Sequence, residues 1–417
     1  MLSFSILLDL SLAACIAASE VRAQLHGAQL CAWTPLTETL LECSTRELMT
    51  DNNNDTTPTP RNSTRDHEPL GWTGPHGCAG NYCLYANRGF AAGRGIVVVS
   101  TPDNILRVKR LEEELQHQNP EDESTSASGP PFQVTEVDGK GLGMIANRSL
   151  ARGDVVMLKT PVLLAHRGFI ERTPPADKHS ILDTVPGLLP APTRRGFLGQ
   201  MGHFGGHQVS DILATNSFQM DLGGGDGQHY GNFYEVSRYN HDCRPNVAFR
   251  IDDDLRHRTT AVRPVAPGEE LTISYLDPLG VRSVRQHRAR RAWGFECACS
   301  QCSLPRKLSA TSDERLLEVE ELERRLSDVG TVVTASTVER FLKLYKEERL
   351  EAKMAGAYTT AALNYNLLGR NKMAVKYARL AIEAGTIENG PGAPDVEAMR
   401  ALAADPKKHF TWRGRLR

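Results

Sequence analysis

The sequence predicts an α+β protein, in which a β-rich domain over residues 132–275 precedes an all-α region over residues 304–417. Short runs that alternate polar and apolar residues, punctuated by Gly and Pro, follow one another through 132–275 and are typical of strands. After Cys302 these signals end, and leucines recur at helical spacing. The chain has 417 residues, of which 40% are hydrophobic, so we expect two or three domains with a sizeable core.

The charge balance excludes one class of function. The chain carries 49 Lys and Arg against 50 Asp and Glu, a formal net charge of −1, so it has no general basic coat for nucleic acids. The longest apolar stretch is interrupted by Asp9 and falls short of the ~20 residues that a membrane-spanning helix needs. We therefore expect neither sequence-specific nucleic-acid binding nor a membrane span.

Residues 1–23 resemble a secretory signal peptide. An apolar segment over 10–18 is followed by small residues that suit cleavage after Ala23. No Lys or Arg precedes the apolar segment, and Asp9 lies beside it. A buried N-terminal helix of a cytosolic protein, or an incorrectly assigned start, would also explain these residues. We expect entry into the secretory pathway, with the nucleus or cytoplasm as the alternative.

The nine cysteines fall into an early and a late group. Apart from Cys15 in the signal-like segment, they are Cys31, Cys43, Cys78 and Cys83, then Cys243, Cys297, Cys299 and Cys302. Two disulfides early and one four-thiolate metal site late would use all eight. Free buried thiols are the alternative for the early group. Acceptor triplets for N-glycosylation at Asn54 and Asn62 favour an exposed secreted loop between the early pairs.

The cysteine-containing N-terminal segment, residues 24–118, is expected to include a small β-rich unit over residues 71–101. A polar loop with several prolines over 51–69 divides it, and the β-branched run IVVVS after Gly95 predicts a strand. Residues 106–118 predict a helix that ends in a linker over 119–131, rich in Pro, Glu, Ser and Gly. We place a domain boundary at this linker.

Few helices are expected inside the β-rich domain, except in a helical or looped insertion over about 193–219. A cysteine-rich tail over 276–303 follows, and Asp313 is expected to cap the first helix of the C-terminal region. Residues 358–383 suggest a tetratricopeptide-type helical hairpin whose small residues allow close approach. Such a hairpin would serve as a structural support, or alternatively as a peptide-binding groove.

Three short motifs carry the functional signal: GKGLGM over 139–144, NHDCRPN over 240–246 and GEELTISY over 268–275. Each alone has an ordinary explanation. A Gly-x-Gly after a strand is usually a turn, and a Tyr that ends an apolar run is usually half-buried in a sheet. Their order, followed by GFECACSQC over 294–302, makes the combination specific.

In this order the motifs resemble a SET-domain lysine methyltransferase with a cysteine-rich post-SET tail. The resemblance covers residues 132–302, and the helical C-terminus is similar to that of the SET-and-MYND subfamily. The MYND finger of that subfamily is not visible as an insertion, so the chain looks more like fungal SET proteins without the finger. Those proteins have a cysteine-containing N-terminal segment similar to residues 31–101.

The resemblance implies S-adenosylmethionine as methyl donor and assigns roles to individual residues. The Gly-x-Gly turn would let the backbone approach the donor, Lys140 would lie near the donor carboxylate, and Phe295 would stack on the adenine. Tyr275 would be the catalytic residue, with its hydroxyl beside the methyl group and the incoming amine. The implied donor-binding residues are Lys140, Gly141, Gly143, Asn240, His241, Tyr275 and Phe295. A solvated Lys140, a structural His241 and a Phe295 that packs beside the metal site are the alternatives.

Four thiolates, from Cys243, Cys297, Cys299 and Cys302, form a closed tetrahedral set for structural Zn²⁺. Reactive or disulfide-bonded cysteines are the alternative, but the C-x-C spacing strains a local disulfide. Asp242 stands where the family often has Ser, a departure that leaves the ligands intact. Zinc would fasten the tail over the donor pocket.

An arginine cluster precedes the zinc cysteines: Arg282, Arg285, Arg288, Arg290 and Arg291. A solvated helix face is its simplest interpretation, and a surface that binds an acidic substrate or the nucleosome is the alternative. We expect a protein-lysine N-methyltransferase whose partner is a protein substrate that presents a lysine, with chromatin proteins among the candidates. The alternative function is a catalytically inactive, zinc-stabilised SET fold that serves as an interaction module with a helical-repeat scaffold.

Overall fold

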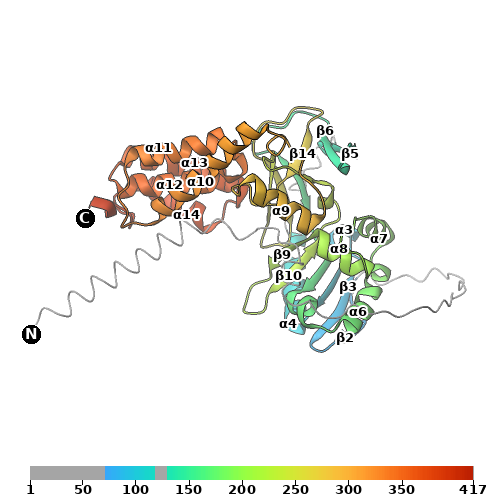
Figure 1. The fold of residues 1–417 in the computed structure, drawn as a ribbon. Coiled ribbons are helices and arrows are strands. Elements are labelled where there is room, and N and C mark those ends of the chain that lie inside the picture. Colours follow the sequence, from blue (N-terminus) through green and yellow to red (C-terminus); the bar gives the residue numbers. More distant parts are fainter. Residues whose placement is uncertain (1–70, 118–128, 417) are drawn as a thin grey trace, which may run out of the picture.

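The computed structural model describes residues 71–117 and 129–416. The signal-like segment, the loop 51–69, Cys31 and Cys43 lie outside this part of the chain. The described residues form a region of three sheets with flanking helices and, beside it, a stack of long helices (Figure 1). The predicted α+β fold class, with a β-rich domain followed by a helical C-terminal region, is confirmed.

The largest sheet has seven strands in the order β1-β3-β4-β8-β10-β9, with β2 paired to β3. Its strands are β1 (Trp72–Thr73), β2 (Cys78–Ala79), β3 (Tyr82–Asn87), β4 (Ile96–Ser100), β8 (Leu163–His166), β9 (Ser217–Asp221) and β10 (Gln228–Asn232). A disulfide joins Cys78 to Cys83 across the β2–β3 pair. The short helix α3 (Phe90–Gly93) precedes β4, and α4 (Pro102–His117) follows it.

The sheet pairing corrects the predicted division of the N-terminal half. Strand β4, wholly buried, pairs in parallel with β8, so that Val97 lies opposite Leu163. Residues 72–100 therefore belong to the same sheet as strands of the predicted SET domain, and they are not a separate unit before the linker. The physical reason is that the backbone N–H and C=O groups of a buried strand need hydrogen-bond partners along both edges. Strand β4 pairs with β3 on one edge and with β8, which lies beyond the linker, on the other.

The rest of the described β structure forms two smaller sheets, and the first of them carries the strands of all three sequence motifs. The first has the order β11-β14-β6-β5, and the second the order β12-β13-β7. Their strands are β5 (Phe132–Val137), β6 (Gly141–Ala146), β7 (Val155–Lys159), β11 (Asn240–His241), β12 (Val247–Ile251), β13 (His257–Ala261) and β14 (Glu270–Ile273). The parallel pair β11–β14 places His241 opposite Ile273, which brings two motifs that are distant in the sequence to one sheet edge.

The insertion between β8 and β9 is more helical than expected. It contains α5 (Arg167–Arg172), α6 (Pro175–Leu188), α7 (Ala191–Leu198) and α8 (Gln208–Asn216), whereas we expected helices only from about residue 193. Proline commonly marks a turn, yet α6 and α7 each have a proline in their first turn, where its missing N–H costs nothing. A short 3₁₀ turn, η2 (Val236–Arg238), leads into β11.

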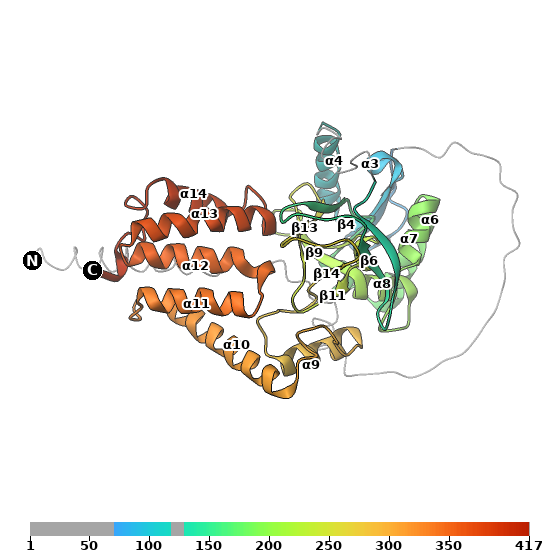
Figure 2. The same ribbon diagram turned by 90° about the horizontal axis from the view of Figure 1, so that it is seen from above.

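The tail and the C-terminal region form a chain of helices (Figure 2). They are α9 (Arg282–Trp293), α10 (Arg306–Ser327), α11 (Ala335–Glu347), η3 (Glu351–Lys353), α12 (Met354–Leu367), α13 (Asn371–Glu388), α14 (Pro394–Ala404) and η4 (Gly414–Leu416). Helix α10 begins before the expected cap Asp313, whose carboxylate instead accepts a hydrogen bond from the backbone N–H of Arg282 at the start of α9 (2.8 Å).

Helices α12 and α13 pack along each other, and alanines such as Ala361 and Ala378 are fully buried between the helices of this region. A helical hairpin therefore lies where one was predicted, while its likeness to a tetratricopeptide stays a prediction. In the described part of the chain, no helix combines the length and apolar character needed to cross a membrane.

Candidate functional site

Four cysteines from two distant segments meet in one buried cluster. Cys243 follows β11, and the other three follow α9; the four sulfurs lie within 4.8 Å of one another. The Sγ of Cys243 is 3.9 Å from that of Cys297 and 3.6 Å from that of Cys302. Four sulfurs at the usual Zn–S distance of about 2.3 Å stand about 3.8 Å apart in a tetrahedron, so these spacings suit a zinc ion.

The electrostatics of the cluster also suit a dication. Hydrogen bonding among the thiols, to Cys297 first, raises the pKa of Cys243, whereas hydrogen bonding to Cys243 lowers the pKa of Cys299. A thiolate on one cysteine thus opposes ionisation of its neighbours, because like charges at contact repel. A Zn²⁺ ion removes this conflict, since all four thiolates then face a positive charge.

Next to the cysteines, His241, Tyr275, Trp293 and Phe295 form an aromatic group. The ring of Tyr275 lies 5.3 Å from that of His241, 5.5 Å from that of Trp293 and 6.2 Å from that of Phe295, measured between centroids. His241 is 5% exposed, and its Nδ1 accepts a hydrogen bond from the backbone N–H of Tyr275 (3.0 Å). The His241 imidazole therefore holds the backbone of Tyr275 in position.

On the neighbouring edge, Asn240 lies against the Gly-x-Gly turn. A Cβ on Gly143 would come within 2.7 Å of the Asn240 Nδ2, so only glycine leaves room for the amide here. The same Nδ2 donates to the carboxylate of Glu270 (2.9 Å), which also pairs with the Lys140 ammonium (2.6 Å). Because the Lys140–Glu270 pair is partly exposed, its contribution to stability is about 0.2–1 kcal/mol, and its effect is mainly on geometry.

Asn246, the last residue of the NHDCRPN motif, connects the loop after β11 to strand β14 by hydrogen bonds. Asn246 is 1% exposed; its Oδ1 accepts from the backbone N–H of Thr272 (2.9 Å), and its Nδ2 donates to the backbone carbonyl of Glu270 (2.8 Å). These two bonds satisfy strand groups that would otherwise be buried without partners. They bind the loop after β11 to the strand that leads to Tyr275.

Burial keeps the His241 imidazole and the Tyr275 phenol uncharged near neutral pH. It lowers the pKa of His241 to about 4 and raises the pKa of the enclosed Tyr275 hydroxyl well above its usual value. The pKa of Asp242 rises to about 6, also because of burial. A neutral imidazole and a neutral phenol donate and accept hydrogen bonds without acting as strong acids or bases, which suits a site that orients reactants.

The predicted site residues thus come together in one region. Gly143, Asn240, His241, Tyr275 and Phe295 surround the end of β11 and lie next to the cysteine cluster. The turn residues Lys140 and Gly141 are exposed at its margin. The Lys140 ammonium is held by Glu270, so a donor carboxylate would share or replace that contact.

Some residues of the site were missed or misjudged from the sequence. Arg285 is 2% exposed and lies beside the cluster, with its Nη2 3.9 Å from the Cys302 Sγ. The interpretation of the arginine cluster as a solvated face is therefore wrong for Arg285, although Arg290 and Arg291 are exposed. A buried guanidinium is tolerated there because it faces sulfur groups that carry negative charge when ionised.

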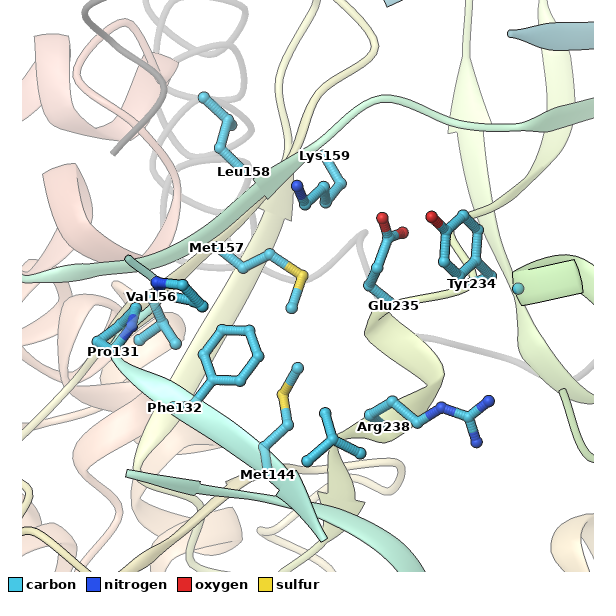
Figure 3. A pocket seen from close by; sticks show the side chains of 13 residues that line it. Pro131, Phe132, Met144, Val156, Met157, Leu158, Lys159, Tyr234, Glu235 and Arg238 are labelled. Carbon is cyan, nitrogen blue, oxygen red and sulfur yellow. The ribbon is translucent and has the colours of Figure 1, made fainter. Parts of the chain in front are cut away.

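A separate open pocket of about 450 Å³ lies on the other face of β6. In Figure 3, the side chains of Phe132, Met144 and Met157 point into it, with Glu235 and Arg238 of the η2 region at its side. Neighbouring residues of a strand face opposite ways, so Met144 faces this pocket while Gly143 faces Asn240. The pocket is therefore distinct from the region of the predicted donor site.

Comparisons with known proteins agree with this architecture. Residues 141–276 match the family model of the SET domain. The chain is 28% identical over 206 residues to the histone-lysine N-methyltransferase set5 of Schizosaccharomyces pombe, covering 48% of this chain and 60% of that protein. It is 32% identical over 127 residues to the N-lysine methyltransferase SMYD2 of Bos taurus, covering 30% of this chain and 27% of that protein.

The histone-lysine N-methyltransferase SET5 of Saccharomyces cerevisiae is 38% identical over 78 residues, which cover 18% of this chain and 15% of that protein. The matched segments thus span less than two thirds of each of these relatives. The fold and the matched motifs define a protein that contains a SET domain. It is similar to lysine methyltransferases, including fungal ones.

Proposed function

We propose that this protein transfers methyl groups from S-adenosylmethionine to lysine side chains of a protein substrate, histone or non-histone. The observation that carries the proposal is the convergence of Asn240, His241, Tyr275 and Phe295 beside the Gly-x-Gly turn, within a domain whose relatives are named as lysine methyltransferases. Histones appear in the names of some relatives, and for this chain they are one candidate substrate.

The donor would lie against the Gly-x-Gly turn at the start of β6. Gly141 and Gly143 would let the backbone approach it, Lys140 would face its carboxylate, and the Asn240 amide and the His241 backbone would hold its polar groups. Phe295, half-buried beside His241, would cover the adenine. This assignment uses the residues that the motifs predicted, among them Asn240, whose amide leaves no room for a side chain at Gly143.

Bound S-adenosylmethionine would supply a methyl group on a sulfonium sulfur. The lysine nitrogen would attack the methyl carbon in line, so that the N–C bond forms as the S–C bond breaks and the thioether leaves. The lysine must arrive neutral, and an enclosed, largely apolar surround lowers its pKa because burial disfavours the ammonium. Tyr275, His241, Trp293 and Phe295 can supply such aromatic walls. The fixed Tyr275 hydroxyl would orient the amine and the methyl group in line.

Zinc, held by Cys243, Cys297, Cys299 and Cys302, would give the tail a fixed position. Its role would be structural, because four protein ligands leave no open coordination position. Cys297 and Phe295 are two residues apart, so a metal that fixes the cysteine also limits the positions of the aromatic ring. Metal loading and donor binding would therefore be coupled.

The test is incubation of the purified full chain with isotopically labelled donor and a panel of histone and non-histone proteins. Transfer of label to lysine supports the proposal. The alternative, a catalytically inactive SET-fold interaction module, requires neither transfer nor donor binding. Titration calorimetry with S-adenosylmethionine separates the two, and absence of donor binding to zinc-loaded protein would contradict the proposed activity.

From the sequence alone we also propose that the chain enters the secretory pathway, with cleavage after Ala23. The support is the signal-like segment, the early cysteines and the two glycosylation triplets. Mass spectrometry of the mature N-terminus with differential thiol labelling tests it. An intact N-terminus together with free early thiols would favour the nucleus or cytoplasm instead.

A further inference from the structure

Arg244 and Glu348 form a buried ion pair between the motif loop after β11 and the helical C-terminal region. The Arg244 Nη2 lies 2.9 Å from the Glu348 Oε2, and the two side chains are 3% and 2% exposed. Arg244 directly follows the cysteine ligand Cys243, and Glu348 directly follows helix α11. The pair therefore connects two parts of the chain that are 104 residues apart.

Each donor of Arg244 holds a different part of the site. Its Nη1 donates to the backbone carbonyl of Cys243 (2.8 Å) and to that of Pro278 (3.1 Å). Its Nε donates to the backbone carbonyl of Glu348, at the C-terminal end of α11, where a cation is favoured by the helix dipole. One guanidinium thus links the loop with Cys243, the segment just after Tyr275 and the end of α11.

Glu348 extends this connection to the cysteine-rich tail. Its Oε2 also accepts hydrogen bonds from the Ser312 hydroxyl of α10 (2.6 Å) and from the Gln301 Nε2 (3.2 Å). Gln301 is the neighbour of Cys302 in the sequence. The carboxylate therefore contacts groups on both segments that carry cysteines of the cluster, although it lies in the helical region.

We propose that Glu348 is a positioning residue for the zinc and donor site, acting through Arg244, so that the helical region is a working part of the SET domain. The expected effect on donor binding rests on the proposed function. The expected effect on zinc binding depends only on the cysteine cluster. Outer partners that hold a ligand loop in place commonly change metal affinity by about 10- to 100-fold when they are removed.

The structure offers a matched control on the same helices. Glu318 of α10 pairs with Arg340 of α11 at 2.5 Å, but this pair is about 40% exposed (39% and 41%) and has no contact with the motif loop in the described hydrogen bonds. Glu348→Gln keeps the shape of the side chain and removes its charge. It leaves Arg244 buried without a compensating carboxylate, which a buried charge tolerates poorly.

The experiment measures zinc release from the zinc-loaded full chain to a chromogenic chelator, and the affinity for S-adenosylmethionine by calorimetry, both well below the unfolding temperature. We expect E348Q to release zinc about tenfold faster or more and to bind the donor at least about tenfold more weakly. E318Q should match the wild type in both. The charge-neutral double variant R244M/E348Q should be no worse than R244M alone, because the two residues act as one unit.

Several results would overturn the proposal. If E348Q lowers only the thermal midpoint and matches E318Q in zinc release and donor affinity, Glu348 is merely a structural residue. If E348Q does not fold, R244K carries the test, since it keeps the charge and loses the multiple donors of the guanidinium; zinc release equal to wild type would then contradict the proposal. If the wild type binds zinc but no donor, the proposed function fails, while the comparison of zinc release still decides the role of Glu348.

Discussion

The hydroxyl of Tyr275 donates a hydrogen bond to the backbone carbonyl of Tyr239, with 2.5 Å between the two oxygens. Tyr239 is itself held, because its own buried hydroxyl is 2.7 Å from the Thr259 Oγ1. The proton of Tyr275 is therefore directed at a fixed acceptor one residue before Asn240. The hydroxyl oxygen keeps its lone pairs for a further partner, which makes its position relative to a substrate well defined.

The first prediction follows for Tyr275→Phe. The variant keeps the aromatic ring and its contacts with His241 and Trp293, so donor affinity should change little. Turnover should fall about 10²- to 10³-fold, the usual cost of losing one preorganised polar group at a reacting centre. Steady-state kinetics with calorimetry of donor binding checks both. A parallel loss of donor affinity and turnover would place Tyr275 in donor binding alone.

The second prediction concerns metal content. Protein purified without added zinc should contain close to one zinc per chain, because the structure places one set of four thiols at zinc-compatible spacing in its described part. Removal of the metal by a chelator should weaken donor binding, since metal and tail are coupled. Atomic emission of the purified protein is the measurement. Absence of metal together with four freely reactive late thiols would contradict the site.

A third prediction tests the Gly-x-Gly turn with Gly143→Ala. The new Cβ would meet the Asn240 Nδ2 and the Val137 Cγ2 at 2.7 Å each, so the Asn240 amide must shift from its present position. We expect donor affinity to fall about tenfold or more, the effect of a ligand group displaced by a fraction of an ångström. Gly356→Ala in α12, where a Cβ meets nothing within 4 Å, is the control and should bind the donor normally.

Local sequence patterns were enough to predict the fold class, but not the connections between distant segments, and the roles of the individual site residues stay predictions. The motifs around Asn240 and Tyr275 can be recognised because their residues are adjacent in the sequence. Strand β14 can be recognised because it ends a run of alternating polar and apolar residues. Which strands pair is decided by burial far along the chain. The parallel contact of β4 with β8, for example, has no signature in the residues on either side of the linker.

The buried arginines illustrate a second limit. Arginine is almost never fully buried unless it is paired, so exposure was the reasonable expectation for Arg285. Its partners are the Cys302 sulfur and the Gly280 carbonyl, and Arg244 finds its partner in Glu348. Since neither the contact of Arg285 with Cys302 nor the pair of Arg244 with Glu348 occurs within a local sequence window, composition and periodicity could not reveal them.

The last prediction concerns the dependence of stability on pH and follows from His257. This side chain is fully buried, stacked on Phe249 with 5.1 Å between ring centroids and in edge contact with Phe218. Neither of its ring nitrogens has a hydrogen-bond partner among the described residues. Burial in these apolar surroundings lowers the pKa of the imidazole to about 3.

The sign of the effect is set by the unfolded chain, in which a histidine has a pKa of about 6.5. Between pH 6.5 and 3 the unfolded state binds a proton that the folded state rejects, so the free energy of unfolding falls as the pH falls through this range. Above about pH 6.5 the contribution of His257 to stability is fully present. At pH 5 about 2 kcal/mol of it should be lost, at about 1.36 kcal/mol for each pH unit.

His257→Phe should remove this contribution. Its ring can keep the contacts with Phe218 and Phe249, and it cannot be protonated, so the variant should lose about 2 kcal/mol less than the wild type between pH 7 and pH 5. Urea unfolding at the two pH values measures the difference, and comparing slopes cancels any pH-independent packing cost of the larger ring. His287→Gln, which removes an exposed imidazole, serves as the control. If H257F and the wild type lose the same stability on acidification, His257 is protonated or solvated in the folded protein, and the aromatic cluster around it is open to water.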